Sequence, residues 1–140
     1  MRIEWIGSLL LYGYEIPTLV HPKSFISSSA IISYGSAVFA NAAIQAKVNI
    51  GYGSIINTSS SIDHHCILSS GVHVFPGSSL AGNVSVGSNS IIGIGSSVIQ
   101  GVNIGSNVVV GAGAAVISDL PNNVLALGVT VSIYKIIDSL

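Results

Sequence analysis

The sequence predicts an all-β chain wound as a parallel β-helix of six-residue repeats, with a short N-terminal helix and a short C-terminal extension. Three observations predict this fold. Aliphatic residues recur at every sixth position without insertion, and a small or aliphatic residue stands four positions after each. Glycine or asparagine stands three positions after eleven of the seventeen aliphatic residues. Those two residue types adopt the positive φ that a tight corner requires.

The repeat predicts a β-helix over residues 20–121. Its aliphatic positions are Val20, Ile26, Ile32, Val38, Ile44, Ile50, Ile56, Ile62, Leu68, Val74, Leu80, Val86, Ile92, Val98, Ile104, Val110 and Val116. A period of six fits neither an amphipathic helix nor a flat strand, but it fits a short strand followed by a corner. The aliphatic residue then points into the core and the small residue fills the corner. Cys66 stands at a small position and is interpreted as a core residue rather than a nucleophile.

The repeat is flanked by two shorter segments. Residues 1–19 contain "IEWIGSLLLYGYEIPT", which predicts a short helix over about residues 3–12, ended by Gly13, and a linker. Residues 122–140 follow Pro121 and are expected to form a strand or a short helix. Some apolar residues fall on outward positions of the repeat and are expected to need a cover from another subunit: Ile55, Ile67, Ile91 and Val109.

Composition excludes several classes of partner. The chain has 140 residues, which suits one domain, and a net charge of −1 without a Lys/Arg cluster, which argues against nucleic acid. No run of about 18–20 apolar residues occurs, which argues against a membrane partner. A single cysteine and the lack of a signal-peptide pattern predict an intracellular, cytoplasmic protein.

One stretch gathers most of the titratable chemistry. "SSSIDHHCILSSGVHVFPG", residues 59–77, holds three of the four histidines. The register points Ile62 inward, so His64 and His65 are expected to face outward at a corner. His73 precedes an inward valine and also faces outward. Histidine suits general-base catalysis because its ordinary pKa, about 6.5, lies near neutral pH.

Three segments carry a resemblance to a known family: "INTSSSIDHHC", "GVHVFPGSSLAGNVSVGSNSIIGIGSSVIQGVNIG" and "VVVGAGAAVISDLPNNV". They resemble the hexapeptide-repeat, left-handed β-helix acyltransferases. The likeness is to the bacterial sialic acid O-acetyltransferases and the UDP-amino-sugar N-acetyltransferases of the bacillosamine type, over residues 9–129. Two departures are evident. The chain is expected to lack most of that family's N-terminal Rossmann-like domain, and residues 128–131 read Gly-Val-Thr-Val where the family has Gly-x-Pro-Ala.

The resemblance implies a fold, an assembly and a reaction. Three hexapeptides would form each left-handed coil, and three chains would form a homotrimer. Acetyl-CoA would be the cosubstrate. Its acetyl group would pass directly to an amine or a hydroxyl of a nucleotide-linked sugar in surface polysaccharide or glycan biosynthesis.

The resemblance also implies roles for residues of the histidine stretch. His64 matches the general base, and Asp63 is expected to accept a hydrogen bond from its imidazole, as the acid does in a His–Asp pair. His73, His65 and Asn57 are expected to position the substrate or the acetyl group, His73 across a subunit interface. His21 is interpreted as structural.

Backbone groups are expected to bind the cofactor. Gly82 lies three hexapeptides after His64, one coil further on at the same corner. Its N–H would donate to the thioester oxygen as an oxyanion group. Four further positions match the groove that contacts pantetheine: Gly93, Ile94, Gly111 and Ala112.

Two alternative functions are weighed. A bare β-helix would serve as a non-catalytic trimeric scaffold, which predicts no binding of acetyl-CoA. A carbonic anhydrase-like zinc site would need three histidine ligands, two of them closely spaced. His64 and His73 are nine residues apart and no histidine follows His73, so no metal is expected.

Overall fold

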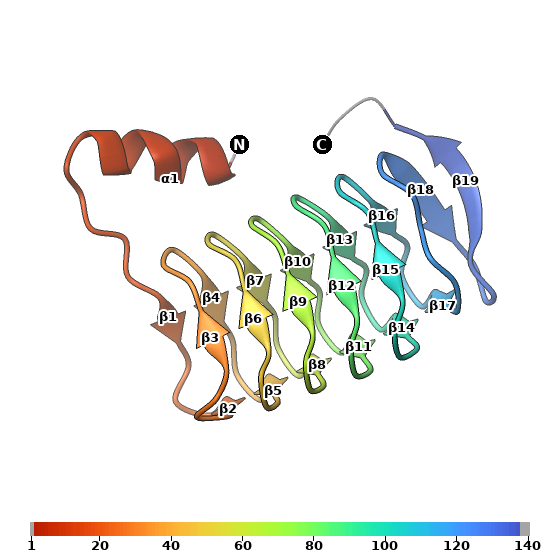
Figure 1. Cartoon of the computed structure of the whole chain (residues 1–140), viewed down its shortest axis with the longest axis horizontal. Helices are drawn as coiled ribbons and strands as arrows, with labels where there is room; N and C mark the ends of the chain where they lie inside the picture. The colour runs from red at the N-terminus through yellow and green to blue at the C-terminus, as the bar shows by residue number, and fades with distance from the viewer. Residues whose placement is uncertain (1, 138–140) are drawn as a thin grey trace.

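The computed structural model describes residues 2–137, and its coils stack into a triangular prism (Figure 1). One helix, α1 (Arg2–Leu11), precedes the coils. Within residues 2–137, seventeen strands of two residues follow it, and two longer strands close the chain. The left-handed parallel β-helix and the short N-terminal helix expected from the sequence are confirmed.

The strands form three sheets, one for each face of the prism, and all their pairings are parallel except that of β18 with β19. Sheet A contains β1 (Leu19–Val20), β4 (Ala37–Val38), β7 (Ile55–Ile56), β10 (His73–Val74), β13 (Ile91–Ile92), β16 (Val109–Val110), β18 (Val124–Leu127) and β19 (Ser132–Ile136). Sheet B contains β2 (Phe25–Ile26), β5 (Ala43–Ile44), β8 (Ser61–Ile62), β11 (Ser79–Leu80), β14 (Ser97–Val98) and β17 (Ala115–Val116). Sheet C contains β3 (Ile31–Ile32), β6 (Asn49–Ile50), β9 (Ile67–Leu68), β12 (Ser85–Val86) and β15 (Asn103–Ile104).

The predicted register is confirmed in each of these coils. The second residue of every two-residue strand is one of the seventeen aliphatic positions, and three hexapeptides separate neighbouring strands of a sheet. His73, for example, pairs with Ile55 and Ile91. From Val38 onward these aliphatic side chains are buried. Val20 remains 49% exposed because no earlier coil stacks against it.

The corners are built as the sequence predicts. Every sixth residue from Gly35 to Gly113 has a positive φ. Most of these residues are glycine or asparagine, but three are not. Lys47, Ser59 and His65 adopt φ values of +57°, +56° and +59°, in a region that L-residues other than glycine seldom occupy. The repeat therefore imposes the corner geometry even where the residue does not favour it.

Small residues inside the corners also link successive coils. Ser78 Oγ donates to Gly93 O at 2.7 Å, and Ser90 Oγ donates to Gly105 O at 2.7 Å. Cys66 Sγ makes the equivalent contact, 3.1 Å from Ala81 O. Cys66 is fully buried, and this burial raises the pKa of its thiol. The interpretation of Cys66 as a core residue is consistent with this placement.

Substitution of Cys66 tests this interpretation. We expect Cys66→Ser to lower the melting temperature by only a few degrees, because serine makes the same link to the next coil elsewhere in the chain. Cys66→Leu should destabilise the fold by about 1–3 kcal/mol through overpacking. Thermal unfolding of both variants measures the difference. Equal melting temperatures for the two variants would contradict the account.

The helix α1 is held on the corners between sheets C and A. Arg2 donates from Nε to Gly53 O at 2.6 Å and from Nη2 to Gly71 O at 2.9 Å. A Cβ added at Gly53 would lie 2.5 Å from Ile3 Cδ1 and 2.8 Å from Ile6 Cδ1. Figure 1 shows α1 along this edge of the prism. The corner glycines thus provide the surface on which the helix docks.

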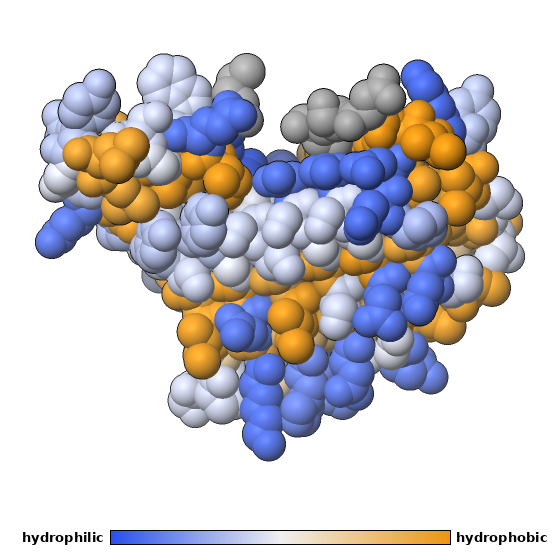
Figure 2. Space-filling model, turned by 45° about the horizontal axis from the view of Figure 1, so that its top comes forward, coloured by the Kyte–Doolittle hydropathy of each residue, from blue (hydrophilic) through white to orange (hydrophobic). Residues whose placement is uncertain are grey.

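The parallel pairing continues past residue 121. Strand β18 pairs with β16, and β19 turns back to pair antiparallel with β18. The predicted C-terminal extension therefore forms strands up to Ile136, and residues 138–140 lie outside the described residues, as does residue 1. Figure 2 shows hydrophobic areas at both ends of the prism, over the α1 end and over β18–β19. No helix within residues 2–137 is long and apolar enough to span a bilayer.

Candidate active site

His64 lies against Gly82 of the next coil. A Cβ added at Gly82 would be 2.5 Å from Cε1 and 2.8 Å from Nε2 of the imidazole. The other ring nitrogen, Nδ1, is 3.1 Å from Nδ1 of His65. The two rings meet edge to face, with centroids 5.2 Å apart and an interplanar angle of 85°. His64 is therefore held between a glycine backbone and a second imidazole.

Asp63 contacts the backbone of His64. Its Oδ1 accepts the main-chain N–H of His64 at 2.7 Å. Within residues 2–137, Asp63 makes no hydrogen bond to an imidazole nitrogen. The carboxylate thus shapes the corner from which His64 projects, whereas His65 contacts the ring itself.

Gly82 has a backbone N–H without a hydrogen-bond partner in residues 2–137. Its neighbours are paired, because Ala81 N donates to Val98 O and Asn83 N donates to His64 O. The residue is buried, with the His64 ring over it. The unpaired N–H therefore belongs to a residue that the His64 ring contacts. This placement fits the oxyanion role expected for Gly82.

His73 belongs to a second cluster, on sheet A. Asn57 Oδ1 accepts the N–H of Thr58 at 2.8 Å, which turns Asn57 Nδ2 toward His73 Nε2 at 3.3 Å. An amide nitrogen only donates, so Nε2 of His73 accepts and its neutral ring carries the proton on Nδ1. Phe75 stacks on the same ring, with centroids 4.0 Å apart. The Asn57–His73 pairing brings two predicted site residues together.

Burial, and to a lesser extent the positive charge of Arg2, lower the pKa of His73 below its ordinary value of 6.5. The neutral form accordingly prevails in the folded chain at neutral pH. Sequence reasoning did not predict Arg2 or Phe75 at this site. The spacing of Phe75 from His73 could have predicted it, because alternate residues along a strand share a face. No such signal existed for Arg2, because only the docking of α1 brings it near.

The lowered pKa of His73 predicts a stability that depends on pH. The unfolded chain binds this proton more readily, so the contribution is complete above about pH 6.5 and is lost as pH falls through the folded pKa. Between pH 8 and pH 5, we expect the melting temperature of the wild type to fall further than that of His73→Gln. Thermal unfolding across that range measures the difference. An offset between the two proteins that does not change with pH would contradict the prediction.

The residues expected to bind the cofactor lie at the corners between sheets A and B. The N–H groups of Gly93 and Gly111 donate to Val110 O and Ala126 O, both at 2.9 Å. Those of Ile94 and Ala112 have no partner within residues 2–137, and both residues are exposed. Ile94 and Ala112 are therefore the positions with free donors, while Gly93 lets the coils approach closely. The sequence did not distinguish these two roles.

The predicted site residues fall into two groups on different parts of the prism. Asp63, His64, His65 and Gly82 lie at the corners between sheets B and C. The second group lies on sheet A and at its corners with sheet B: Asn57, His73, Gly93, Ile94, Gly111 and Ala112. Sheet A is the face opposite the first group, so the packed core separates His64 from His73. One chain does not bring the two groups together.

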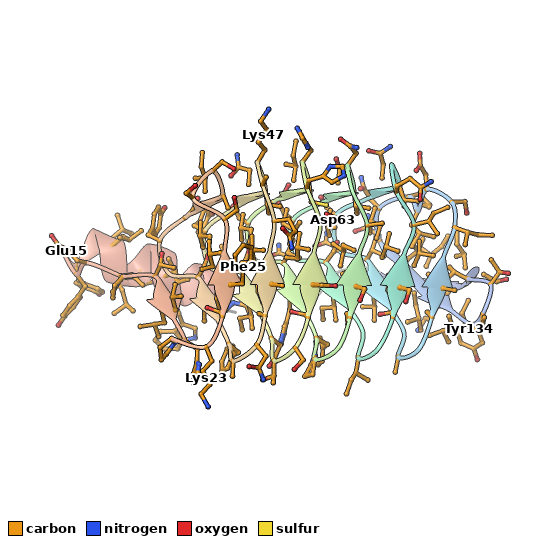
Figure 3. All side chains as sticks on the ribbon, turned by 90° about the horizontal axis from the view of Figure 1, so that it is seen from below. Glu15, Lys23, Phe25, Lys47, Asp63 and Tyr134 are labelled. Carbon is orange, nitrogen blue, oxygen red and sulfur yellow. The ribbon has the colours of Figure 1, made fainter. Side chains whose placement is uncertain are left out.

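A groove of 530 Å³ runs along sheet B beside the first group. Figure 3 looks onto this sheet, with Lys47 and Asp63 on one edge and Lys23 on the other. The lining of the groove is more apolar than polar, and an outward serine on each of three successive strands contributes polar groups to it. Its polar lining residues are Gln45, Ser61, Asp63, Ser79, Ser97 and Gln100. Such a surface offers hydroxyl, amide and carboxylate groups to a polar ligand.

Across residues 2–137, no three side chains of His, Cys, Asp or Glu are placed together to hold a metal ion. The His64–His65 pair uses its Nδ1 atoms for mutual contact.

Comparison with solved structures identifies related folds. A mutant of perosamine N-acetyltransferase from Caulobacter crescentus, in complex with CoA and GDP-perosamine, matches with 40% identity and a TM-score of 0.95. The match covers 96% of this chain and 64% of that protein. In sequence and fold, the chain resembles hexapeptide-repeat sugar acetyltransferases. No protein-family model and no curated protein sequence matches significantly.

Two further structures extend the likeness. The acetyltransferase domain of PglB from Neisseria gonorrhoeae, in complex with acetyl coenzyme A, is 37% identical, with a TM-score of 0.93 over 94% of this chain and 64% of that one. WeeI from Acinetobacter baumannii shares the fold at 24% identity, with a TM-score of 0.90 over 94% of this chain and 65% of that one. The chain thus spans just under two thirds of the length of these three proteins.

Proposed function

We propose that the chain transfers acetyl from acetyl-CoA to an amino group of a nucleotide-linked sugar. The observation that carries the proposal is the His64 imidazole, which lies against Gly82, a residue whose N–H has no partner within residues 2–137. The likeness to acetyltransferases seen with CoA, acetyl-CoA and GDP-perosamine supports the cosubstrate and the acceptor class. A role in surface polysaccharide or glycan biosynthesis follows from that acceptor class.

The reaction needs one base and one stabiliser of negative charge. Nε2 of His64 takes the proton as the acceptor nitrogen attacks the thioester carbonyl. The new C–N bond forms, the C–S bond breaks, and the CoA thiolate leaves as its thiol by taking the proton that Nε2 of His64 accepted. The N–H of Gly82 donates to the carbonyl oxygen while that oxygen carries negative charge. Asp63 maintains the corner through its bond to the backbone of His64.

The second group completes the site from a neighbouring chain. We place the corner that bears His64 against sheet A of the next subunit of a homotrimer. His73 and Asn57 of that subunit then position the acetyl group or the sugar. The free N–H groups of Ile94 and Ala112, beside Gly93 and Gly111, then bind the pantetheine arm. Outward Ile55, Ile91 and Val109, half-buried on sheet A, would be covered by this contact.

Subunit mixing tests the shared site. His64→Asn and His73→Ala chains should each be inactive, because each removes one half of every site. When the two are unfolded, mixed and reassembled, we expect activity at about a quarter of the sites, where an intact His64 corner meets an intact sheet A. Each variant reassembled alone is the control. A mixture no more active than the separate variants would contradict a site shared between chains.

Turnover of acetyl-CoA distinguishes an acetyltransferase from a non-catalytic scaffold. The purified chain should release CoA from acetyl-CoA in the presence of a GDP- or UDP-linked 4-amino sugar, with the acetyl group found on the amine by mass spectrometry. A matched nucleotide sugar with a hydroxyl in place of the amine should react more slowly. Faster transfer to the hydroxyl would overturn the choice of acceptor. No transfer to either would favour the non-catalytic scaffold.

A further inference from the structure

The contact between His64 and His65 restricts where their protons lie. The two Nδ1 atoms are 3.1 Å apart. A hydrogen bond across that gap needs an N–H on one ring and a lone pair on the other. If both rings carried protons on Nδ1, two N–H groups would face each other. The contact therefore assigns opposite proton occupancy to the two Nδ1 atoms.

The corner fixes His65 in this place. Its φ is +59°, and its N–H donates to Ala46 O at 3.0 Å. The equivalent residues one coil before and one coil after, Lys47 and Asn83, have φ values of +57° and +60°. The repeat imposes this conformation at each such corner, whichever residue occupies it. The backbone conformation thus fixes the direction of the Cα–Cβ bond of His65, from which its ring reaches His64.

Neither charged neighbour performs the same task. The Asp63 carboxylate accepts the backbone N–H of His64. Lys47, one coil earlier at the same corner position, only donates hydrogen bonds. On the following coil, Gly82 and Asn83 carry no charge. His65 is the only side chain within residues 2–137 that is hydrogen-bonded to the His64 ring.

From these contacts we propose that His65 is a positioning residue that holds His64 in its reactive tautomer. Nδ1 of His64 donates its proton to the Nδ1 lone pair of His65, whose own proton lies on Nε2. The lone pair of His64 is thereby kept on Nε2, the nitrogen beside Gly82. This inference rests on the proposed function and deepens it, because it names the group that prepares the base.

Ring nitrogen NMR shifts test the tautomer without an activity assay. In the neutral, assembled protein, we expect His64 to carry its proton on Nδ1 and His65 on Nε2. In His65→Gly, which suits the positive φ, the preference at His64 should be lost. Lys47→Gly is the matched control at the same corner position and should leave the tautomer unchanged. A proton on Nε2 of His64 in the wild type would overturn the proposal.

Kinetics separate positioning from a merely structural role. We expect His65→Gly to lower kcat about 10- to 100-fold with KM for acetyl-CoA unchanged, because a misplaced base slows only the chemical step. His65→Glu restores an acceptor and should recover most of the loss, whereas Lys47→Gly should retain wild-type kcat. If His65→Gly kept wild-type kcat while His64→Asn was inactive, the positioning role of His65 would be refuted and the proposed function would stand. Full activity in His64→Asn would instead refute the proposed function.

Discussion

Replacement of His64 by asparagine is expected to lower kcat for acetyl transfer by about 10²- to 10⁴-fold, the usual contribution of a general base. Asparagine is neutral and cannot accept the acceptor's proton. Acetyl-CoA should still bind, because the expected cofactor contacts come from backbone groups. Steady-state kinetics with a nucleotide-linked amino sugar measure the loss, and a binding titration measures the retained affinity.

His21→Asn provides the matched control. His21 is an exposed histidine on the first coil, and its Nδ1 accepts the N–H of Lys23 at 3.1 Å. It lies at the corner between sheets A and B two coils before Asn57, and its hydrogen bonds within residues 2–137 are to Lys23, Ser24 and Val38. We therefore expect kcat not to change. If the two variants had equal kcat, His64 would not be the base.

Substitution of Gly82 by alanine should have the second-largest effect. The added Cβ would lie 2.5 Å from Cε1 and 3.1 Å from Nδ1 of His64. The ring must move, and a misplacement of about 1 Å at a reacting group costs about 100-fold in rate. The melting temperature should change little, because the φ of Gly82 is not positive and the atoms that must move are those of a side chain.

Gly101→Asn is the control for the Gly82 substitution. Gly101 lies in the corresponding corner one coil further on, at the position equivalent to Asn83. Its φ is +74°, and no atom lies within 4 Å of an added Cβ. Asparagine adopts this conformation elsewhere in the chain, for example at Asn83. We expect wild-type kcat. If Gly82→Ala had the same kcat as wild type, as Gly101→Asn should, the position of the His64 ring would not limit the reaction.

The repeat made the fold predictable from the sequence. A side chain that recurs every six residues has the same environment at each step, so its register fixes which residues face inward. Thus Ile62 is buried and His64 projects outward at a corner, as expected. The C-terminal segment was less predictable, because the period ends there and β18 pairs with β16 through a shorter coil, Val109 with Leu125.

The candidate site was only partly predictable. The stacking of Gly82 on His64 followed from a spacing of three hexapeptides, the coil length that the resemblance supplied. The direction in which a side chain turns did not follow. Asp63 was expected to contact the imidazole and contacts the backbone instead, whereas His65 contacts the ring. That choice depends on rotamers and on the left-handed corner at His65, which the sequence pattern does not encode.

Calorimetric titration of the purified chain with acetyl-CoA, beside His64→Asn, tests the central claim most directly. The account predicts micromolar binding with one site per chain for both proteins, and a rise in melting temperature on addition of acetyl-CoA. No heat and no thermal stabilisation of the wild type would contradict the assignment of an acetyl-CoA-dependent acyltransferase.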